Sequence, residues 1–233
     1  MAHRLPLDSA FPHPRHGAGE RAALRYFVGH ALMDQVEELR HTREDRDAAR
    51  FDAETSAGRS RGPLHGVPVL IKDNVETADR MATTAGSLAL KDNVTGRDAP
   101  AVARLRAAGA VILGKTNLSE WANIRSTHAM SGWSAVGGLV KNPYALDRTA
   151  CGSSSGSGAA VAARSRYGSL GSDTGGSIRL PASACGVTGI KGTQSLPGEV
   201  SDFGIVTLFL QLIDNHDWND HRLFLEAEHR LWV

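Results

Sequence analysis

The chain has 233 residues, of which 41% are hydrophobic and 22% are charged, so it can bury a core and is expected to form one globular domain. A formal net charge of +1 provides no basic field of the kind that captures nucleic acid, and no window approaches eighteen consecutive apolar residues. We therefore expect a cytoplasmic protein without a signal peptide or membrane span and without direct nucleic-acid binding. Cys151 and Cys185 are too few for a disulfide framework and are expected to be small buried thiols.

The first predicted elements alternate between helix and strand. Residues 23–56 are charged, with apolar positions three to five apart, and predict one or two surface helices. Residues 67–71 form a short apolar run after turn punctuation, which predicts a buried strand with Lys72 at its end. Next comes a helix that Asp98 can cap and that Gly109 ends, followed by a strand over residues 110–116.

The second part of the chain contains two loops rich in glycine and serine. Residues 123–149 are loop-like, and we expect Trp121 and Trp133 to pack under this loop, with a substrate cage as the alternative. After it come a Gly/Ser loop, an alanine-rich helix near residues 158–163, a strand ending at Asp173, and a second Gly/Ser loop over 171–183. The alternation predicts an α/β fold with a mixed central sheet flanked by helices.

The stretch "DTGGS" has the residue types that acyl transfer requires. Because glycine lets successive N–H groups point into one space, the amides of Thr174, Gly175 and Gly176 could hold an oxyanion while the Ser177 hydroxyl attacks a carbonyl carbon. By composition alone the stretch could equally be a flexible linker. Lys72 is a candidate base because burial lowers the pKa of an amine, although a lysine at a strand end is more often a solvated cap.

Three segments together resemble the amidase signature family: "GPLHGVPVLIKDN", "CGSSSGSGAAVAA" and "GSDTGGSIRLPASACGVTGIK". The resemblance covers residues 64–193. It implies the amidase signature fold and a Ser–cis-Ser–Lys triad that hydrolyses an amide bond through an acyl-enzyme, with no metal or organic cofactor. Ser177 would be the nucleophile, Ser153 the bridging serine after a cis peptide, and Lys72 the base. Arg179 and Asp173 would support the loop, and the substrate would be a small-molecule amide.

The resemblance also suggests a division of the chain. Residues 1–193 would form the amidase signature core and residues 194–233 a divergent tail, produced by truncation or a changed reading frame, because family members are about twice as long. An incomplete sheet would leave an unpaired edge, which favours homo-oligomers or association with another chain. The peptide-amidase branch is the first interpretation. The alternatives are a glutaminase subunit of a tRNA-dependent amidotransferase and an inactive fragment that acts as a binding partner.

Two other interpretations of the sequence have less support. "CGSSSGSG" could be a phosphate-binding loop, but it lacks the Gly-Lys-Ser/Thr ending of a P-loop. The tail segment "HDWNDH" contains His216 and His221, whose spacing of five fits no common ligand motif, so a solvated loop is expected there instead of a metal site.

Overall fold

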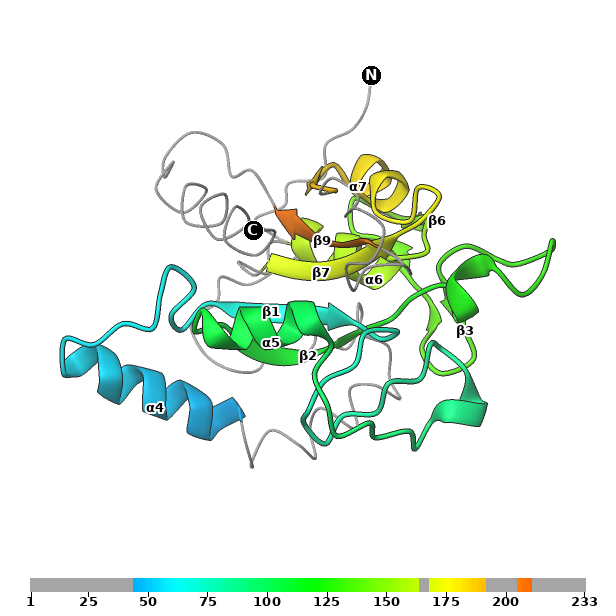
Figure 1. Ribbon diagram of the computed structural model, residues 1–233. Helices are drawn as coiled ribbons and strands as arrows, with labels where there is room; N and C mark the ends of the chain where they lie inside the picture. Colours follow the sequence, from blue (N-terminus) through cyan, green and yellow to red (C-terminus); the bar gives the residue numbers. More distant parts are fainter. Residues whose placement is uncertain (1–43, 164–167, 192–204, 211–233) are drawn as a thin grey trace, which may run out of the picture.

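The centre of the molecule is a mixed five-stranded sheet with the strand order β2-β1-β7-β9-β8 (Figure 1). The computed structural model describes residues 44–163, 168–191 and 205–210. Strand β1 is parallel to its neighbours β2 and β7, whereas β9 is antiparallel to both β7 and β8. The predicted α/β fold with a mixed sheet is therefore confirmed. The strands are β1 (Pro68–Lys72), β2 (Val111–Thr116), β7 (Gly168–Asp173), β8 (Thr188–Gly189) and β9 (Ile205–Leu210).

Four α-helices and two short 3-10 helices accompany this sheet in the described residues. The α-helices are α4 (Glu44–Ser56), α5 (Pro100–Ala107), α6 (Ser155–Ala162) and α7 (Arg179–Cys185), and the 3-10 helices are η1 (Leu88–Leu90) and η2 (Glu120–Asn123). Of the helical region expected over residues 23–56, the part before residue 44 lies outside the described residues. Helix α7 was not predicted, because its residues were assigned to the second Gly/Ser loop. It ends at Gly186, whose φ of 62° suits a residue without a Cβ.

The alternation of β1 directs its side chains to two different layers. Val69 and Ile71 belong to the main core cluster, together with Val102 and Leu105 of α5, which lies across β1 and β2 in Figure 1. Since successive strand residues point to opposite faces, Lys72 lies on the other face of the sheet from Ile71. Helix α6 packs against β7, β1 and β2. The sheet thus separates an apolar core from a layer that contains serine residues.

The start of α5 differs from the sequence-based expectation. Asp98 does not cap this helix: the N-cap position is Ala99, it makes no side-chain capping bond, and Pro100 follows it. The Asp98 carboxylate instead accepts hydrogen bonds from the Ala78 N–H at 2.6 Å and from Arg106 Nε at 3.0 Å. The acid is used to join two distant segments, which sequence spacing alone does not reveal.

Residues 123–149, expected to be loop, contain two short antiparallel strand pairs. One pair consists of β3 (Trp133–Ser134) and β4 (Gly138–Leu139), and the other of β5 (Lys141–Asn142) and β6 (Ala145–Thr149). The Asn142 side chain donates to the Ala184 carbonyl at 2.6 Å and so fastens this region to α7. Three of these strands have only two residues each, and β6 is mostly exposed along its five residues, so none shows a clear apolar period of two in the sequence.

Only a small part of the predicted tail is described. Residues 205–210 form β9, which inserts between β7 and β8, while His216 and His221 lie outside the described residues. In the described ranges, no helix has the length and apolar character needed to cross a membrane.

Candidate active site

The Lys72 side chain is fully buried and lies between two serine hydroxyls. It ends β1, and its Nζ donates to Ser153 Oγ at 2.8 Å and to Ser172 Oγ at 2.9 Å. Burial lowers the pKa of this amine from its usual value to about 7, although the negative charge of Asp173 acts in the opposite direction. An amine with such a pKa is substantially neutral near pH 7 and can accept a proton.

Ser153 is held by an unusual backbone at the entry to α6. The peptide bond between Gly152 and Ser153 is cis, as the family resemblance implied, and Cys151 before it has a φ of 61°. The Ser119 N–H donates to the Ser153 carbonyl at 3.0 Å, and the Ser153 side chain is fully buried. A Cβ on Gly152 would collide with Ser119 Oγ, so this position requires glycine. The loop thus fixes the serine that faces Lys72.

Ser177 is brought to the same region from the segment that follows β7. The Ser154 N–H donates to the Ser177 carbonyl at 3.0 Å, which connects the two Gly/Ser loops directly. Gly176 before it has a φ of 117°, in the range that favours glycine. Among the described residues, the Ser177 hydroxyl makes no hydrogen bond, so the structure joins Lys72 to Ser153 but does not join Ser153 to Ser177 through their side chains.

Asp173 organises the turn that carries Ser177. Its carboxylate accepts from the N–H groups of Gly176 at 2.8 Å and Ile178 at 3.0 Å, and from Arg179 Nε at 3.2 Å. Burial would raise the pKa of this carboxyl, but the hydrogen bonds from the Arg179 side chain and from the backbone hold it well below its usual range. Lys191 lies 3.6 Å from the same carboxylate. Asp173 therefore stays ionised and holds the loop in shape.

The predicted oxyanion amides are not equivalent. The Gly176 N–H already donates to Asp173, whereas the N–H groups of Thr174 and Gly175 have no acceptor among the described residues. Thr174 and Gly175 are exposed, and a Cβ added to Gly175 would meet only open space. In this conformation Thr174 and Gly175 are better placed than Gly176 to meet an oxyanion.

Sequence reasoning missed three polar residues around Lys72. Ser172 accepts from Lys72 and also from Asn74 Nδ2 at 3.2 Å, and its carbonyl accepts from Ser154 Oγ at 3.0 Å. Ser172 belongs to β7, which is the neighbour of β1 in the sheet, so only the strand pairing places it beside the lysine. The sequence signal for Asn74, Ser154 and Ser172 is that each stands within one of the three segments that carry the family resemblance.

A second buried lysine lies close by but outside this cluster. Lys115 Nζ donates to the Val75 carbonyl at 2.5 Å and to Thr83 Oγ1 at 2.9 Å. Burial lowers the pKa of Lys115 to about 8, and burial raises the pKa of Asp73, the residue after Lys72, to about 6. Asp73 accepts from the N–H of Thr84 at 3.0 Å and from the Thr84 hydroxyl. These contacts fasten the segment after β1.

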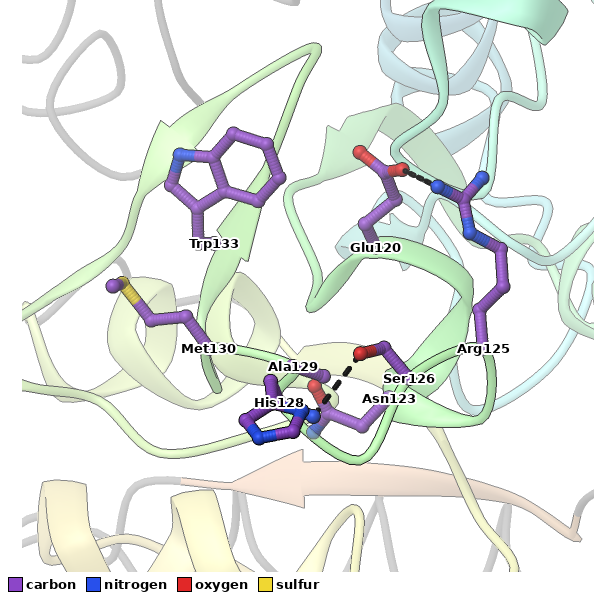
Figure 2. Close-up of a pocket in the computed structure, with 8 residues that line it drawn as sticks. All are labelled: Glu120, Asn123, Arg125, Ser126, His128, Ala129, Met130 and Trp133. Atoms are coloured by element: carbon purple, nitrogen blue, oxygen red, sulfur yellow. Dashed lines mark hydrogen bonds and ion pairs between the residues drawn. The ribbon is translucent and has the colours of Figure 1, made fainter.

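A pocket of about 300 Å³ lies in the loop that precedes β3 (Figure 2). In Figure 2 Trp133 and Met130 lie on one side and the Glu120–Arg125 ion pair, 3.6 Å long, lies on the other. Trp133 is 42% exposed, so the expectation that it packs under the loop was wrong. The residues that line the pocket are Glu120, Asn123, Arg125, Ser126, His128, Ala129, Met130 and Trp133.

This pocket is linked to the loop that carries Ser153. Asn123 Nδ2 donates to Ser131 Oγ at 3.0 Å, and Ser131 Oγ lies 3.2 Å from the place where a Cβ on Gly152 would stand. Asn123, which lines the pocket, is therefore connected through Ser131 to the residue just before Ser153. Within the part of the chain that the structure describes, no group of His, Cys, Asp and Glu side chains is arranged to hold a metal ion.

The chain thus has an α/β fold with a mixed sheet, and its buried Lys72 amine contacts the hydroxyls of Ser153 and Ser172. The family model described as Amidase matches residues 36–215 of the chain. The chain therefore belongs to the amidase signature family. The match extends beyond the region 64–193, which carried the resemblance, and into the first part of the segment predicted as a tail.

Individual relatives agree with this membership. A probable amidase from Arabidopsis thaliana is 52% identical over 148 residues, which is 64% of this chain and 28% of that protein. A glutamyl-tRNA(Gln) amidotransferase subunit from Heliobacterium modesticaldum is 50% identical over 159 residues, which is 68% of this chain and 31% of that protein. This chain thus spans less than a third of the length of either protein.

Solved structures are similar as well. The native peptide amidase from Stenotrophomonas maltophilia has a TM-score of 0.65 and 44% identity, covering 78% of this chain and 40% of that chain. An amidase family protein from Bacillus anthracis has a TM-score of 0.67 and 36% identity, covering 78% of this chain and 36% of that chain.

Proposed function

We propose that this chain hydrolyses a carboxamide through the triad Ser177, Ser153 and Lys72. The observation that carries the proposal is the 2.8 Å contact between the buried Lys72 amine and Ser153 Oγ, beside a loop that presents Ser177. Family membership and the similarity to a peptide amidase support the reaction class.

The proposed reaction has two halves that use the same proton relay. Ser177 Oγ bonds to the amide carbon while its proton passes to Ser153, whose own proton passes to Lys72. The C–N bond then breaks, the amine or ammonia leaves with the relayed proton, and an acyl group remains on Ser177. Water next attacks the acyl carbon and gives a proton to the relay, the bond between the acyl carbon and Ser177 Oγ breaks, and the relay returns the proton to Ser177 Oγ as the carboxylic acid leaves. Both halves therefore need only these three side chains, the substrate and one water molecule.

The negative oxygen formed in each half would be held by backbone amides. The N–H groups of Thr174 and Gly175, which have no other acceptor in the described ranges, are the candidates for this role. The pocket lined by Met130 and Trp133 favours a substrate with an apolar substituent, because these two side chains expose apolar surface there.

The decisive experiment measures the intact mass of the purified chain after incubation with a fluorophosphonate. We expect one adduct on the unchanged chain and none on Ser177→Ala, since the probe requires an activated serine. A folded, soluble chain that forms no adduct would contradict the proposal and would favour the alternative of an inactive chain that acts by binding. An adduct that persists in Ser177→Ala would assign the nucleophile to another residue.

A second candidate is the release of ammonia from glutamine. It is favoured by the 50% identity to the glutamyl-tRNA(Gln) amidotransferase subunit from Heliobacterium modesticaldum. Assaying ammonia from glutamine and from C-terminal peptide amides in parallel separates the two. Release only from glutamine, or only when partner subunits are added, would favour the amidotransferase role, and size-exclusion chromatography would show whether the chain associates with itself.

A further inference from the structure

Ser172 accepts hydrogen bonds from Lys72 with two of its oxygen atoms. Lys72 Nζ lies 2.9 Å from Ser172 Oγ and 3.5 Å from the Ser172 carbonyl oxygen, in addition to its contact with Ser153 Oγ at 2.8 Å. The backbone of Ser172 is itself fixed, because its N–H donates to Ser154 Oγ at 3.3 Å and its carbonyl accepts from the same hydroxyl at 3.0 Å. Ser172 is therefore a rigidly held acceptor for the Lys72 amine, beside the contact of that amine with Ser153.

The hydrogen bonds to Ser172 determine where the lone pair of the neutral Lys72 amine points. A neutral lysine amine has two N–H bonds and one lone pair, and only the lone pair can receive a proton. When the two N–H bonds point at Ser172, the lone pair is left to face Ser153 Oγ. When Ser172 Oγ is absent, an N–H can turn toward Ser153 instead, and the lone pair then faces away from the hydroxyl that must give up its proton.

Asn74 also holds the Ser172 hydroxyl through a hydrogen bond. Its Nδ2 donates to Ser172 Oγ at 3.2 Å, so a lone pair of that oxygen faces Asn74. The Oδ1 of Asn74 is buried and has no hydrogen-bond partner within the described residues. A buried polar atom without a hydrogen-bond partner destabilises the fold, so its presence calls for an explanation. Within the described residues, the one side-chain hydrogen bond of Asn74 is the one to Ser172.

We propose that Ser172, held by Asn74, is the positioning residue that turns the lone pair of Lys72 toward Ser153. The inference rests on the proposed amide hydrolysis. It gives Ser172 and Asn74 a role in orienting Lys72, and neither residue contacts the substrate.

Charged groups near Lys72 also influence the pH at which its amine titrates. On the packed strands they are Asp173 of β7 and Lys115 of β2, and Asp73 follows Lys72 in the chain. Helix α6 contributes no titratable side chain, since its sequence is SGSGAAVA. None of these groups changes in the variants below.

The test follows the rate of fluorophosphonate labelling against pH. Ser172→Ala removes an acceptor that stabilises the protonated amine, so the midpoint should move to lower pH while the maximal rate falls about tenfold or more. Ser172→Thr, which keeps the hydroxyl, should restore both values. Asn74→Asp places a carboxylate beside Ser172 and should move the midpoint to higher pH.

Two matched variants control for surface and charge effects. Ser183→Ala removes an exposed hydroxyl from α7, and Ser183→Asp adds a negative charge at the same exposed site. Both should keep the wild-type midpoint and rate. A slower rate in Ser172→Ala with an unmoved midpoint would overturn the positioning role, since a purely structural defect behaves in this way. If Ser172→Ala does not fold, an unmoved midpoint in Asn74→Asp overturns the proposal instead.

A second readout separates this inference from the proposed function. The protonation of Lys72 can be followed by NMR in chains with ¹³C-labelled lysine, with Lys72→Met to assign the signal. Ser172→Ala should lower the Lys72 pKa and Asn74→Asp should raise it, whether or not the chain is labelled by the probe. Absence of labelling would thus refute the hydrolase function, whereas an unchanged Lys72 titration would refute the role of Ser172 and Asn74.

Discussion

The Lys72 amine and the Ser153 hydroxyl lie 2.8 Å apart, and both side chains are fully buried. Lys72 comes from the end of β1, whereas Ser153 stands 81 residues later in the loop before α6. A buried amine that contacts hydroxyl groups loses hydration, and this loss is what makes it a base near neutral pH.

Replacing Lys72 by Met should abolish the base and keep the fold. Met has a similar length and no charge to desolvate, so the chain should remain folded while labelling slows about 10²–10⁴-fold. Labelling kinetics with thermal unfolding as the fold control provide the measurement. Because the relay acts as a unit, Lys72→Met combined with Ser153→Ala should be little slower than either variant alone. Additive losses would contradict a shared relay.

Activity should rise with pH through the Lys72 titration. The relay needs the neutral amine, and burial places the pKa of Lys72 at about 7, so the labelling rate should be low at pH 5.5 and level off above pH 8. The rate is to be measured on one preparation over this range at constant ionic strength. A profile that is flat between pH 6 and about 8 would mean that another group accepts the proton.

The titration of Lys72 should also make the free energy of unfolding depend on pH. An ion-paired lysine stabilises the fold at low pH, whereas the buried Lys72 should make the fold more stable as pH rises. The pKa of Lys72 falls from 10.5 in the unfolded chain to about 7 in the fold, so the unfolded state binds more protons between these values. The free energy of unfolding should therefore gain a contribution as pH rises from 7 toward 10.5, and below 7 the full penalty of charging a buried amine is present. Urea unfolding of Lys72→Met should lack this contribution.

Asp173→Asn should loosen the loop that carries Ser177. The neutral amide can no longer accept from Arg179 and from two backbone N–H groups together, so we expect a loss of about 1–3 kcal/mol in the free energy of unfolding. In the wild type this stability is present above the unfolded pKa of 3.8 and is lost as pH falls below it, because the folded pKa is depressed. Urea unfolding at pH 3 and pH 7 tests both statements. An equal effect of the variant at the two pH values would contradict them.

Lys115→Met should lower folding stability without lowering the labelling rate. It leaves the Val75 carbonyl and the Thr83 hydroxyl without their buried donor, so stability should fall by about 1–3 kcal/mol. Labelling per folded molecule should remain, since Lys115 contacts neither Ser153 nor Ser177. The pair Lys115→Met and Lys72→Met thus compares two buried lysines of similar environment. Complete loss of labelling in a folded Lys115→Met chain would place Lys115 in the relay.

Much of the sheet and its helices could be predicted because local signals coincide with the structure. The apolar run before Lys72 became β1, and Gly109, with a φ of 96°, separates α5 from β2 as expected. Helix α7 escaped prediction because its sequence RLPASAC lacks an apolar period and contains a proline. Strands β3, β4 and β5 escaped because two residues cannot show alternation, and β6 escaped because its five residues are mostly exposed and show no apolar alternation.

The residue types of the site, by contrast, were readable from the chain alone. Lys72, Ser153 and Ser177 stand in the three segments that carry the family resemblance, and it is this resemblance that implies their roles as base, bridging serine and nucleophile. The glycine at position 152 can likewise be read from the sequence. The reason for it, the Ser119 hydroxyl that would collide with a Cβ there, appears only in the folded structure.

Only the tertiary structure decided which groups surround Lys72. The pairing of β1 with β7 brings Ser172 to the amine across a separation of 100 residues, and no sequence spacing encodes that contact. The lowered pKa of Lys72 has the same origin, because desolvation depends on everything packed around a group and not on its neighbours in the chain. The sequence determined which chemical groups are available, and the packing of the sheet determined which of them touch and how they titrate.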